Sequence, residues 1–336
     1  MKTMQWLIKR EFWENKGSFV WAPTILAGAM ILLLFITLGI SNSVHNLQVQ
    51  YSDSSDNVDS GSLVTSNVNT TTDIDGHVVH SLATKLAETL GNAYMGFSLP
   101  IFLALALVIF FYCLNGLYDE RRDRSILFWK SLPVSDHITI ISKLVTAGVI
   151  IPLIAIGIGF LTALLALLIG CIALSVKGIH IFGLVFSAPE VYLAPIQLLA
   201  MVPIYLLWAL PTLGWLMMVS SWARSKVFLW AVGMPLLSAL LLWWMQKIAG
   251  LDVSVGWYMK HIVSRLLLSV LPGRWSDVGL IDPEHNINVH HSAFNLADTL
   301  HEAWMSLGTV EMWVGVIAGL VMLGVAVYMR RWREQG

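Results

Sequence analysis

Long uncharged apolar runs alternate along the chain with segments that are rich in polar residues. A helix needs about 20 apolar residues to cross the hydrocarbon core of a bilayer, and each run is long enough to do so. The pattern therefore predicts an all-α polytopic membrane protein, with residues 1–336 forming a single transmembrane domain. We expect six spans, at Val20–Ile40, Phe97–Leu117, Leu144–Leu174, Val191–Trp222, Val227–Gln246 and Met312–Met329.

The segment before the first span, residues 1–19, mixes apolar and charged residues at near-helical spacing, as at Trp6, Leu7 and Arg10. This pattern predicts a short interfacial helix that lies on the inner membrane surface. A solvated amphipathic helix would give a similar pattern, so the sequence leaves both interpretations open.

Two longer segments between spans differ in kind. Residues 41–95 are rich in Ser, Asp, Asn and Thr, and such a composition cannot bury a core. Residues 247–311 contain the stretch WYMKHIVSRLLLSVLPG, which has an apolar stripe ended by Pro-Gly. This stretch predicts an amphipathic or re-entrant helix before the last span. We expect both segments to lie outside the cytoplasm.

Composition agrees with a membrane protein, and the distribution of charge sets its orientation. Hydrophobic residues make up 57% of the chain and charged residues 12%, with a mean hydropathy of +0.71. With the N-terminus inside, the inner segments hold 14 of the 20 Lys and Arg residues, as the positive-inside rule requires. Both termini are therefore expected in the cytoplasm. The net charge of −1 gives no reason to expect a nucleic-acid partner.

Several functions are disfavoured by what the six predicted spans contain. They have no Asp, Glu, Lys, Arg or His, the residues that mark proton relays, ion pathways and voltage sensors in membranes. The phosphate-binding pattern G-x-x-x-x-G-K-[ST] is also absent, so any ATP hydrolysis must occur in a separate chain. We find no nucleophile–base or carboxylate constellation and expect no catalysis by this chain.

Nine of the ten histidines fall in the outer segments. His301-Glu302 begins the zinc-protease pattern H-E-x-x-H, but Met305 stands where the second histidine is needed. We therefore expect no metal site; the residues that could form one are His285, His290, His291 and His301. Metal or partner binding there would suit an alternative function, a non-transporting sensor or assembly component. Cys113 and Cys171 lie near opposite faces and are not expected to form a disulfide.

The loop YDERRDRSILFWKSLPVSDHITIISK, residues 118–143, concentrates five basic and four acidic residues between two uncharged runs. Its middle predicts a short helix that Pro133 ends, after which a new helix starts at Asp136. Glu120 and Arg121 are expected to be exposed, so that their replacement would leave the protein folded. Positive charge alone could serve only to anchor the loop inside, but that would not explain the four acids.

From Glu120 to Lys143 the loop resembles the inner loop of ABC-2 type permeases, the membrane subunits of type V ABC exporters. The matching features are Glu120, Arg121, Asp123, Ser125, Leu132, Pro133, Val134, Ser135 and Lys143. Arg124 departs from the pattern, since a small residue is usual there.

The resemblance implies two paired permease subunits, identical or different, in a bacterial inner membrane. Each would dock on an ABC ATPase that holds ATP and Mg²⁺, and the loop would act as the coupling helix. The cargo would be amphipathic or lipid-like, a peptide or a drug. The residues implied in ATPase coupling are Glu120, Arg121, Arg122, Asp123, Ser125, Trp129, Leu132 and Pro133.

Overall fold

A computed structural model of the chain is mostly helical over the residues that it describes, which are 2–43, 94–123, 135–176, 182–187, 189–249, 254–273 and 296–332. Within these ranges six helical stretches are long and apolar enough to cross a membrane, which confirms the expected number of spans. They are Gly17–Leu38, Gly96–Arg122, Asp136–Val176, Val191–Trp222, Val227–Ile248 and Val310–Trp332.

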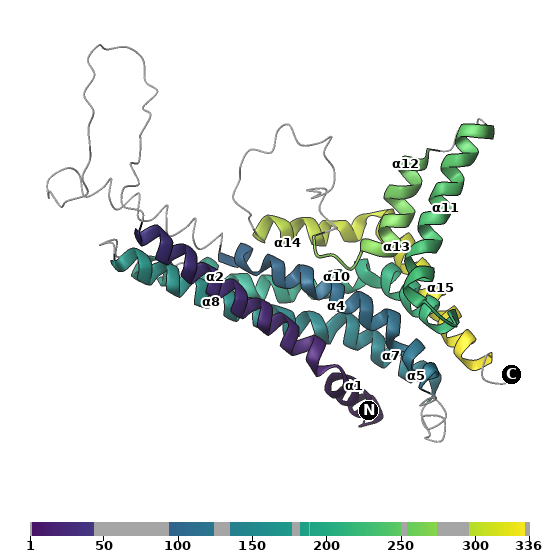
Figure 1. Ribbon diagram of the computed structural model, residues 1–336, viewed down its shortest axis with the longest axis horizontal. Coiled ribbons are helices and arrows are strands. Elements are labelled where there is room, and N and C mark those ends of the chain that lie inside the picture. Colours follow the sequence, from purple (N-terminus) through teal and green to yellow (C-terminus); the bar gives the residue numbers. More distant parts are fainter. Residues whose placement is uncertain are drawn as a thin grey trace, which may run out of the picture.

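The elements follow one another in a simple order (Figure 1). Helices α1 (Lys2–Glu14) and α2 (Ala22–Ser43) are joined by a π-helical turn, η1 (Gly17–Trp21). The first half of the chain continues with η2 (Tyr94–Ser98), α4 (Leu99–Gly116), α5 (Tyr118–Arg122), α7 (Asp136–Val145), η3 (Thr146–Ile150) and α8 (Ile151–Val176). The second half comprises α9 (Phe182–Ser187), α10 (Pro189–Trp222), α11 (Val227–Ala249), α12 (Val255–Tyr258), η4 (Met259–Val263), α13 (Ser264–Leu268), α14 (Leu296–Met305), η6 (Ser306–Gly308) and α15 (Val310–Trp332).

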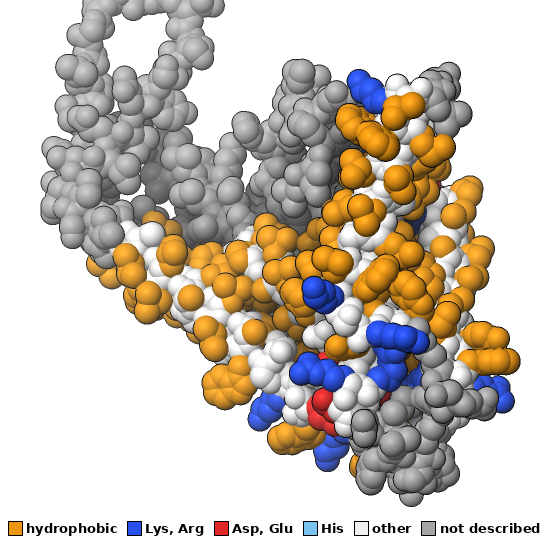
Figure 2. Space-filling model, turned by 45° about the vertical axis from the view of Figure 1, so that its right-hand side comes forward, with side chains coloured by type: hydrophobic (Ala, Val, Ile, Leu, Met, Phe, Trp, Pro, Cys, Tyr) orange, Lys and Arg blue, Asp and Glu red, His pale blue; other side chains and the backbone are white. Residues whose placement is uncertain are grey.

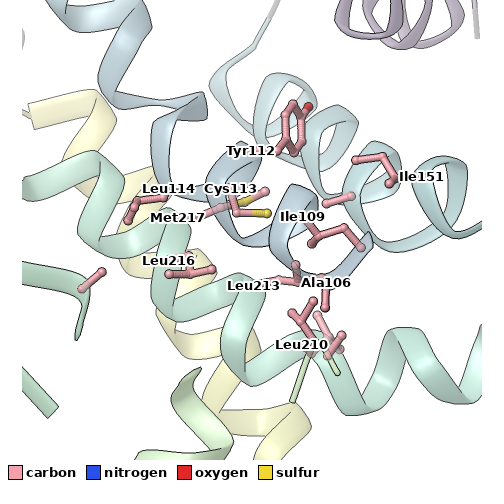
Figure 3. Close-up of a cluster of buried hydrophobic side chains, with 14 of the residues drawn as sticks. Ala106, Ile109, Tyr112, Cys113, Leu114, Ile151, Leu210, Leu213, Leu216 and Met217 are labelled. Carbon is pink, nitrogen blue, oxygen red and sulfur yellow. The ribbon is translucent and has the colours of Figure 1, made fainter. Parts of the chain in front are cut away.

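Helices α4 and α10 form the centre of the bundle. In Figure 3, Ile109 and Cys113 of α4 face Leu213 and Met217 of α10, and Ile151 of α8 closes the cluster on another side. All five side chains are buried. Cys171 belongs to a separate cluster, so the two cysteines are free and lie apart as expected.

A tyrosine just before the second span attaches η2 to α10. The Tyr94 hydroxyl donates a hydrogen bond to the Val191 carbonyl at 2.6 Å, and its ring is buried. Burial raises the pKa of Tyr94 to about 12, because the phenolate would lose its hydration. Tyr94 therefore stays a hydrogen-bond donor over the physiological pH range.

Helix α1 and the end of α15 lie at one end of the bundle, together with α5 and the start of α7 (Figure 1). Figure 2 shows most of the visible Lys and Arg side chains gathered at this end, while apolar side chains cover much of the remaining described surface. We call it the charged end. An even number of spans returns the chain to the side where it began.

Glycines let α10 and α15 come into backbone contact. A Cβ atom added to Gly319 would lie 2.7 Å from the carbonyl carbon and oxygen of Leu210, and one added to Gly214 would lie 2.5 Å from the Gly319 oxygen. Real Cβ atoms do not come so close, so the two helices can cross only where side chains are missing. The sequence Gly315-x-x-x-Gly319 is part of this contact.

The segment from Val255 to Val270 turns back along α10. The Tyr205 hydroxyl, near the middle of this 34-residue helix, donates to the Val270 carbonyl at 2.9 Å. Thr212 donates to the Arg265 carbonyl at 2.9 Å and accepts from the Ser269 N–H at 3.2 Å. A helix that ends within a bundle needs such partners, because its last carbonyls have none of their own.

Replacing Thr212 by valine should loosen the Val255–Val270 segment. The change keeps the shape of the side chain but removes both polar contacts, and a polar contact between membrane helices contributes about 1 kcal/mol. We expect faster hydrogen exchange over residues 255–270 in the purified protein. Thr37→Val is the control, since the Thr37 hydroxyl is exposed and bonds only within its own helix, to the Leu34 carbonyl. Equal exchange in the two variants would contradict this attachment.

Candidate functional site: an ionic cluster at the charged end

Four helices bring charged side chains together at the charged end of the bundle. They are α1, α5 at the end of the second span, α7 at the start of the third, and α15 at the end of the sixth. We call the set formed by Arg10, Glu11, Glu120, Asp136, Lys143 and Arg330 the ionic cluster. Three carboxylates thus meet three cations. Each charge has an opposite charge nearby, which is the condition for burying it.

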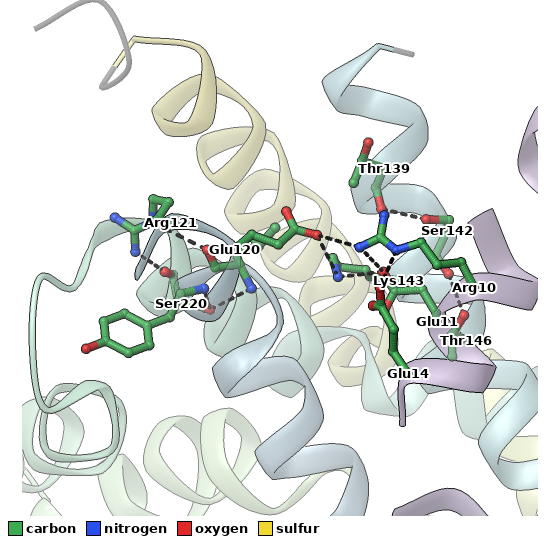
Figure 4. Close-up of polar contacts among 12 residues, drawn as sticks. Arg10, Glu11, Glu14, Glu120, Arg121, Thr139, Ser142, Lys143, Thr146 and Ser220 are labelled. Atoms are coloured by element: carbon green, nitrogen blue, oxygen red, sulfur yellow. Dashed lines mark hydrogen bonds and ion pairs between the residues drawn. The ribbon is translucent and has the colours of Figure 1, made fainter. Parts of the chain in front are cut away.

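Lys143 lies at the centre of the cluster. Its Nζ is 2.7 Å from Glu11 Oε1 and 3.1 Å from Glu120 Oε1, and all three side chains are buried. Figure 4 shows the Glu11 and Glu120 side chains reaching Lys143 from opposite sides. Because Glu11 belongs to α1 and Glu120 to α5, one ammonium group joins the N-terminal helix to the second and third spans.

Arg330 extends the cluster to the last span. One guanidinium nitrogen is 3.0 Å from Glu120 Oε2, and Nε donates to Asp136 Oδ1 at 3.1 Å. Arg330 lies near the end of α15, and Asp136 in the first turn of α7. Each charge therefore also interacts favourably with the dipole of its own helix, the cation at the C-terminus of α15 and the anion at the N-terminus of α7.

The remaining contacts of the ionic cluster hold α1 against the bundle. Arg10 is 3.7 Å from Glu120 Oε1 and also donates to Glu14 at 2.7 Å on the exposed side of α1. Glu11 accepts a hydrogen bond from the Tyr112 hydroxyl through its second oxygen, at 2.9 Å. Glu11 thus has a partner on each oxygen, one from α4 and one from α7, and α1 cannot leave the bundle without exposing a buried lysine.

Arg121 points the other way, to the end of the fourth span. Its guanidinium donates to the carbonyls of Ser220 and Ala223, the second at 3.0 Å. The Ser220 hydroxyl in turn accepts from the backbone N–H groups of Leu117 and Tyr118, at 3.1 and 3.0 Å. These contacts hold the end of α4 and the start of α5 against α10, as Figure 4 shows for Arg121 and Ser220.

The expectation that Glu120 and Arg121 are exposed loop residues is wrong. Glu120 is 7% exposed and Arg121 is half-buried, because the helix of the second span continues to Arg122. The apolar run was expected to end at Leu117, and the third span to begin at Leu144. The helix of the second span instead continues to Arg122, and the helix expected to start at Asp136 runs directly into the third span. Pairing within the ionic cluster allows Glu120 and Lys143 to be buried there.

The other predicted coupling residues fall into two groups. Arg122 and Asp123 are exposed at the end of α5, as a docking role would require. Ser125, Trp129, Leu132 and Pro133 lie outside the described residues, as does the helix expected in the middle of the loop. The helix expected to start at Asp136 is confirmed by α7.

Sequence reasoning missed Glu11 and Arg330 as members of this site, and treated Lys143 only as part of a motif. A signal was present for Glu11, which follows Leu7 by one helical turn on the face that α1 buries. For Arg330 no local signal existed, because basic residues after a span are common and its partner Asp136 is 194 residues away.

The described residues hold no group of three His, Cys, Asp or Glu side chains that could bind a metal ion. His301 is exposed on α14, whereas His285, His290 and His291 lie outside the described residues. The side chains of the ionic cluster join helices to one another, and their charges pair within the cluster.

No protein-family model, no curated protein and no solved structure matches this chain. A function has to be inferred from the geometry of the ionic cluster and from the pattern of the loop.

Proposed function

We propose that this chain is the permease subunit of an ATP-driven exporter, and that a separate ATPase chain docks at its charged end. The observation that carries the proposal is that both helices flanking residues 124–134, α5 and α7, are joined to the rest of the bundle through the ionic cluster. The loop whose sequence resembles a coupling loop therefore starts and ends on charges that connect several spans.

The contacts suggest how movement of the loop would be transmitted. Glu120 connects α5 to Lys143 on the third span and to Arg330 on the sixth. Arg121 connects α5 to the fourth span through the carbonyls of Ser220 and Ala223. A displacement of the loop by an ATPase would thus reach the second, third, fourth and sixth spans together, because the connected helix ends are rigid elements.

The segment from Val255 to Val270 fits the same function. Its hydrogen bonds to Tyr205 and Thr212 support a re-entrant segment, which would enter the bundle from the outer side. Its Arg265 guanidinium lies 4.4 Å from the Trp208 ring centroid and donates to the Glu311 carbonyl at 2.6 Å. An outer segment fixed to both α10 and α15 would move with these spans when the loop is displaced.

The full proposal places two permease subunits in a bacterial inner membrane, with both termini in the cytoplasm and ATP and Mg²⁺ bound by the ATPase. The cargo would be amphipathic or lipid-like, a peptide or a drug, since the spans are apolar with few polar side chains. The energy for transport would come entirely from the partner chain.

The proposal is tested by purifying the tagged chain from its native host in mild detergent. We expect an ATPase to copurify in equal proportion and to hydrolyse ATP. The double variant Arg122→Ala/Asp123→Ala should lose most of the bound ATPase while melting at the same temperature as the native chain, because both side chains are exposed.

The control variant is Arg224→Ala/Arg331→Ala, which changes two exposed residues at the same end of the bundle. It should retain the ATPase. Recovery of the chain alone, or with partners that bind no nucleotide, would refute the exporter function and favour a sensor or assembly component.

A further inference from the structure

The face of α1 that points away from the bundle carries a regular stripe of two residue types. Trp6, Lys9, Trp13 and Lys16 follow one another at intervals of three and four, so they lie on one side of a helix. All four are exposed, the two tryptophans by 52% and 60%. The Lys16 ammonium lies 5.0 Å from the centroid of the Trp13 ring. We call these four residues the Trp–Lys stripe.

The helical path continues without a break from α1 into the first span. The Asn15 N–H bonds to the Glu11 carbonyl at 3.1 Å, and the Phe19 N–H to the Asn15 carbonyl at 3.0 Å. Lys16 therefore keeps the register of the stripe. Because α1 has 13 residues, even its far end lies within about 20 Å of the start of the span. The stripe is thus close to the membrane surface by covalent connection.

The opposite face of α1 belongs to the ionic cluster. Leu7 and Glu11 are each 2% exposed, and Glu11 is bonded to Lys143 and Tyr112. One short helix therefore has a buried face that fastens the ends of several spans and an outer face whose composition suits a membrane surface.

We propose that the Trp–Lys stripe binds the headgroups of anionic phospholipids in the adjoining leaflet, and that this contact holds α1 against the ionic cluster. Tryptophan rings prefer the headgroup level of a bilayer, and lysine ammonium groups pair with lipid phosphates. Lys9 and Lys16 supply two positive charges that alternate with the rings. A compact patch would suit a protein partner at least as well as a lipid surface. A narrow stripe that is connected directly to a span instead fits a planar lipid surface.

The contact would make the bundle sensitive to lipid charge. With anionic lipid present, α1 stays in place and Glu11 remains paired with Lys143. With uncharged lipid, α1 leaves more readily and the cluster loses both Arg10 and Glu11. The lipid contact does not depend on the exporter function, but its consequence does: under the proposed function, the ATPase loop would be coupled to the spans best in an anionic leaflet.

The experiment uses the full-length chain alone, placed in nanodiscs of phosphatidylcholine with or without phosphatidylglycerol. The readout is hydrogen exchange of the amides of α1. We expect phosphatidylglycerol to slow this exchange in the native chain. Lys9→Gln/Lys16→Gln should remove the effect, with exchange in anionic discs faster by up to about 30-fold. Lys9→Arg/Lys16→Arg, which keeps both charges, should retain the protection.

The matched control is Arg224→Gln/Arg331→Gln, which removes the same charge from other exposed positions at the charged end. It should behave like the native chain. Three results would each overturn the lipid contact. They are equal exchange of α1 in both lipids, equal loss of protection in the control, and protection that arises only when an ATPase is added. Since no ATPase is present in the main experiment, its failure is distinguishable from failure of the exporter function, which the copurification tests.

Discussion

Replacing Lys143 by methionine is expected to lower the free energy of unfolding by about 3–5 kcal/mol, since it takes from two buried carboxylates the cation that lies between them. Methionine has a similar length and fills the same space, so packing is nearly preserved. Glu11 loses a partner at 2.7 Å and Glu120 one at 3.1 Å. Denaturant unfolding of the purified protein in detergent, followed by circular dichroism, measures the effect.

The control for this prediction is Lys226→Met, because Lys226 is exposed at the same end of the bundle. It should change stability little, as exposed charges contribute at most about 1 kcal/mol. Adding Glu11→Gln to Lys143→Met should restore part of the loss, because Glu11 then has only Arg10, at 3.9 Å, as a cation, whereas Glu120 keeps Arg330 at 3.0 Å. If Lys143→Met is as stable as Lys226→Met, water must reach the cluster and the pairs contribute no more than surface pairs.

The membrane spans could be predicted from the sequence because a bilayer demands a long apolar run, and such runs are local features. The start of α7 at Asp136 could be predicted from an equally local feature, the position of Pro133 just before it. The ends of the second and third spans could not be placed in this way. An acid such as Glu120 normally ends a span, and here it is buried only because Lys143 and Arg330 approach it from other helices.

The loop pattern therefore pointed to residues that lie in or beside the ionic cluster, but it predicted the wrong environment for Glu120 and Arg121. The loop pattern drew attention to Glu120 and Arg121, yet it could not show that one pairs with cations on two other spans and the other with carbonyls of α10. Partners separated by about 100 residues or more leave no periodic trace. Arg330 is the clearest case, since its partner Asp136 is 194 residues away.

Two kinds of contact thus hold the bundle together at different depths. The ionic cluster fixes helix ends at the charged end, and it can rearrange because ion pairs have alternative partners. Backbone contact between α10 and α15, around Gly214 and Gly319, has no such alternative. Helices that cross with their backbones touching move as one body, so the fourth and sixth spans should respond together to whatever displaces the loop.

Gly319→Ala is the second change for which a large effect is expected. Its Cβ would lie 2.7 Å from the Leu210 carbonyl carbon and oxygen, and a backbone cannot rotate aside as a side chain can. The two helices must separate along their contact, so we expect a loss of about 1–3 kcal/mol in the free energy of unfolding. Denaturant unfolding in detergent measures it, and hydrogen exchange over α10 and α15 should show where the structure has loosened.

Matched positions on α15 separate the effect of the contact from that of the amino acid. Gly324 is exposed, and an added Cβ would meet nothing within 4 Å, so Gly324→Ala should be neutral or stabilising by up to about 1 kcal/mol through helix propensity. Gly315→Ala should fall between the two, because its Cβ would meet the flexible end of Arg265 at 2.9 Å and the Pro211 ring at 3.1 Å. The order Gly319, Gly315, Gly324 follows from what each Cβ meets. A loss as large at Gly324 as at Gly319 would show that α15 responds to glycine replacement anywhere along its length, and not to its crossing with α10.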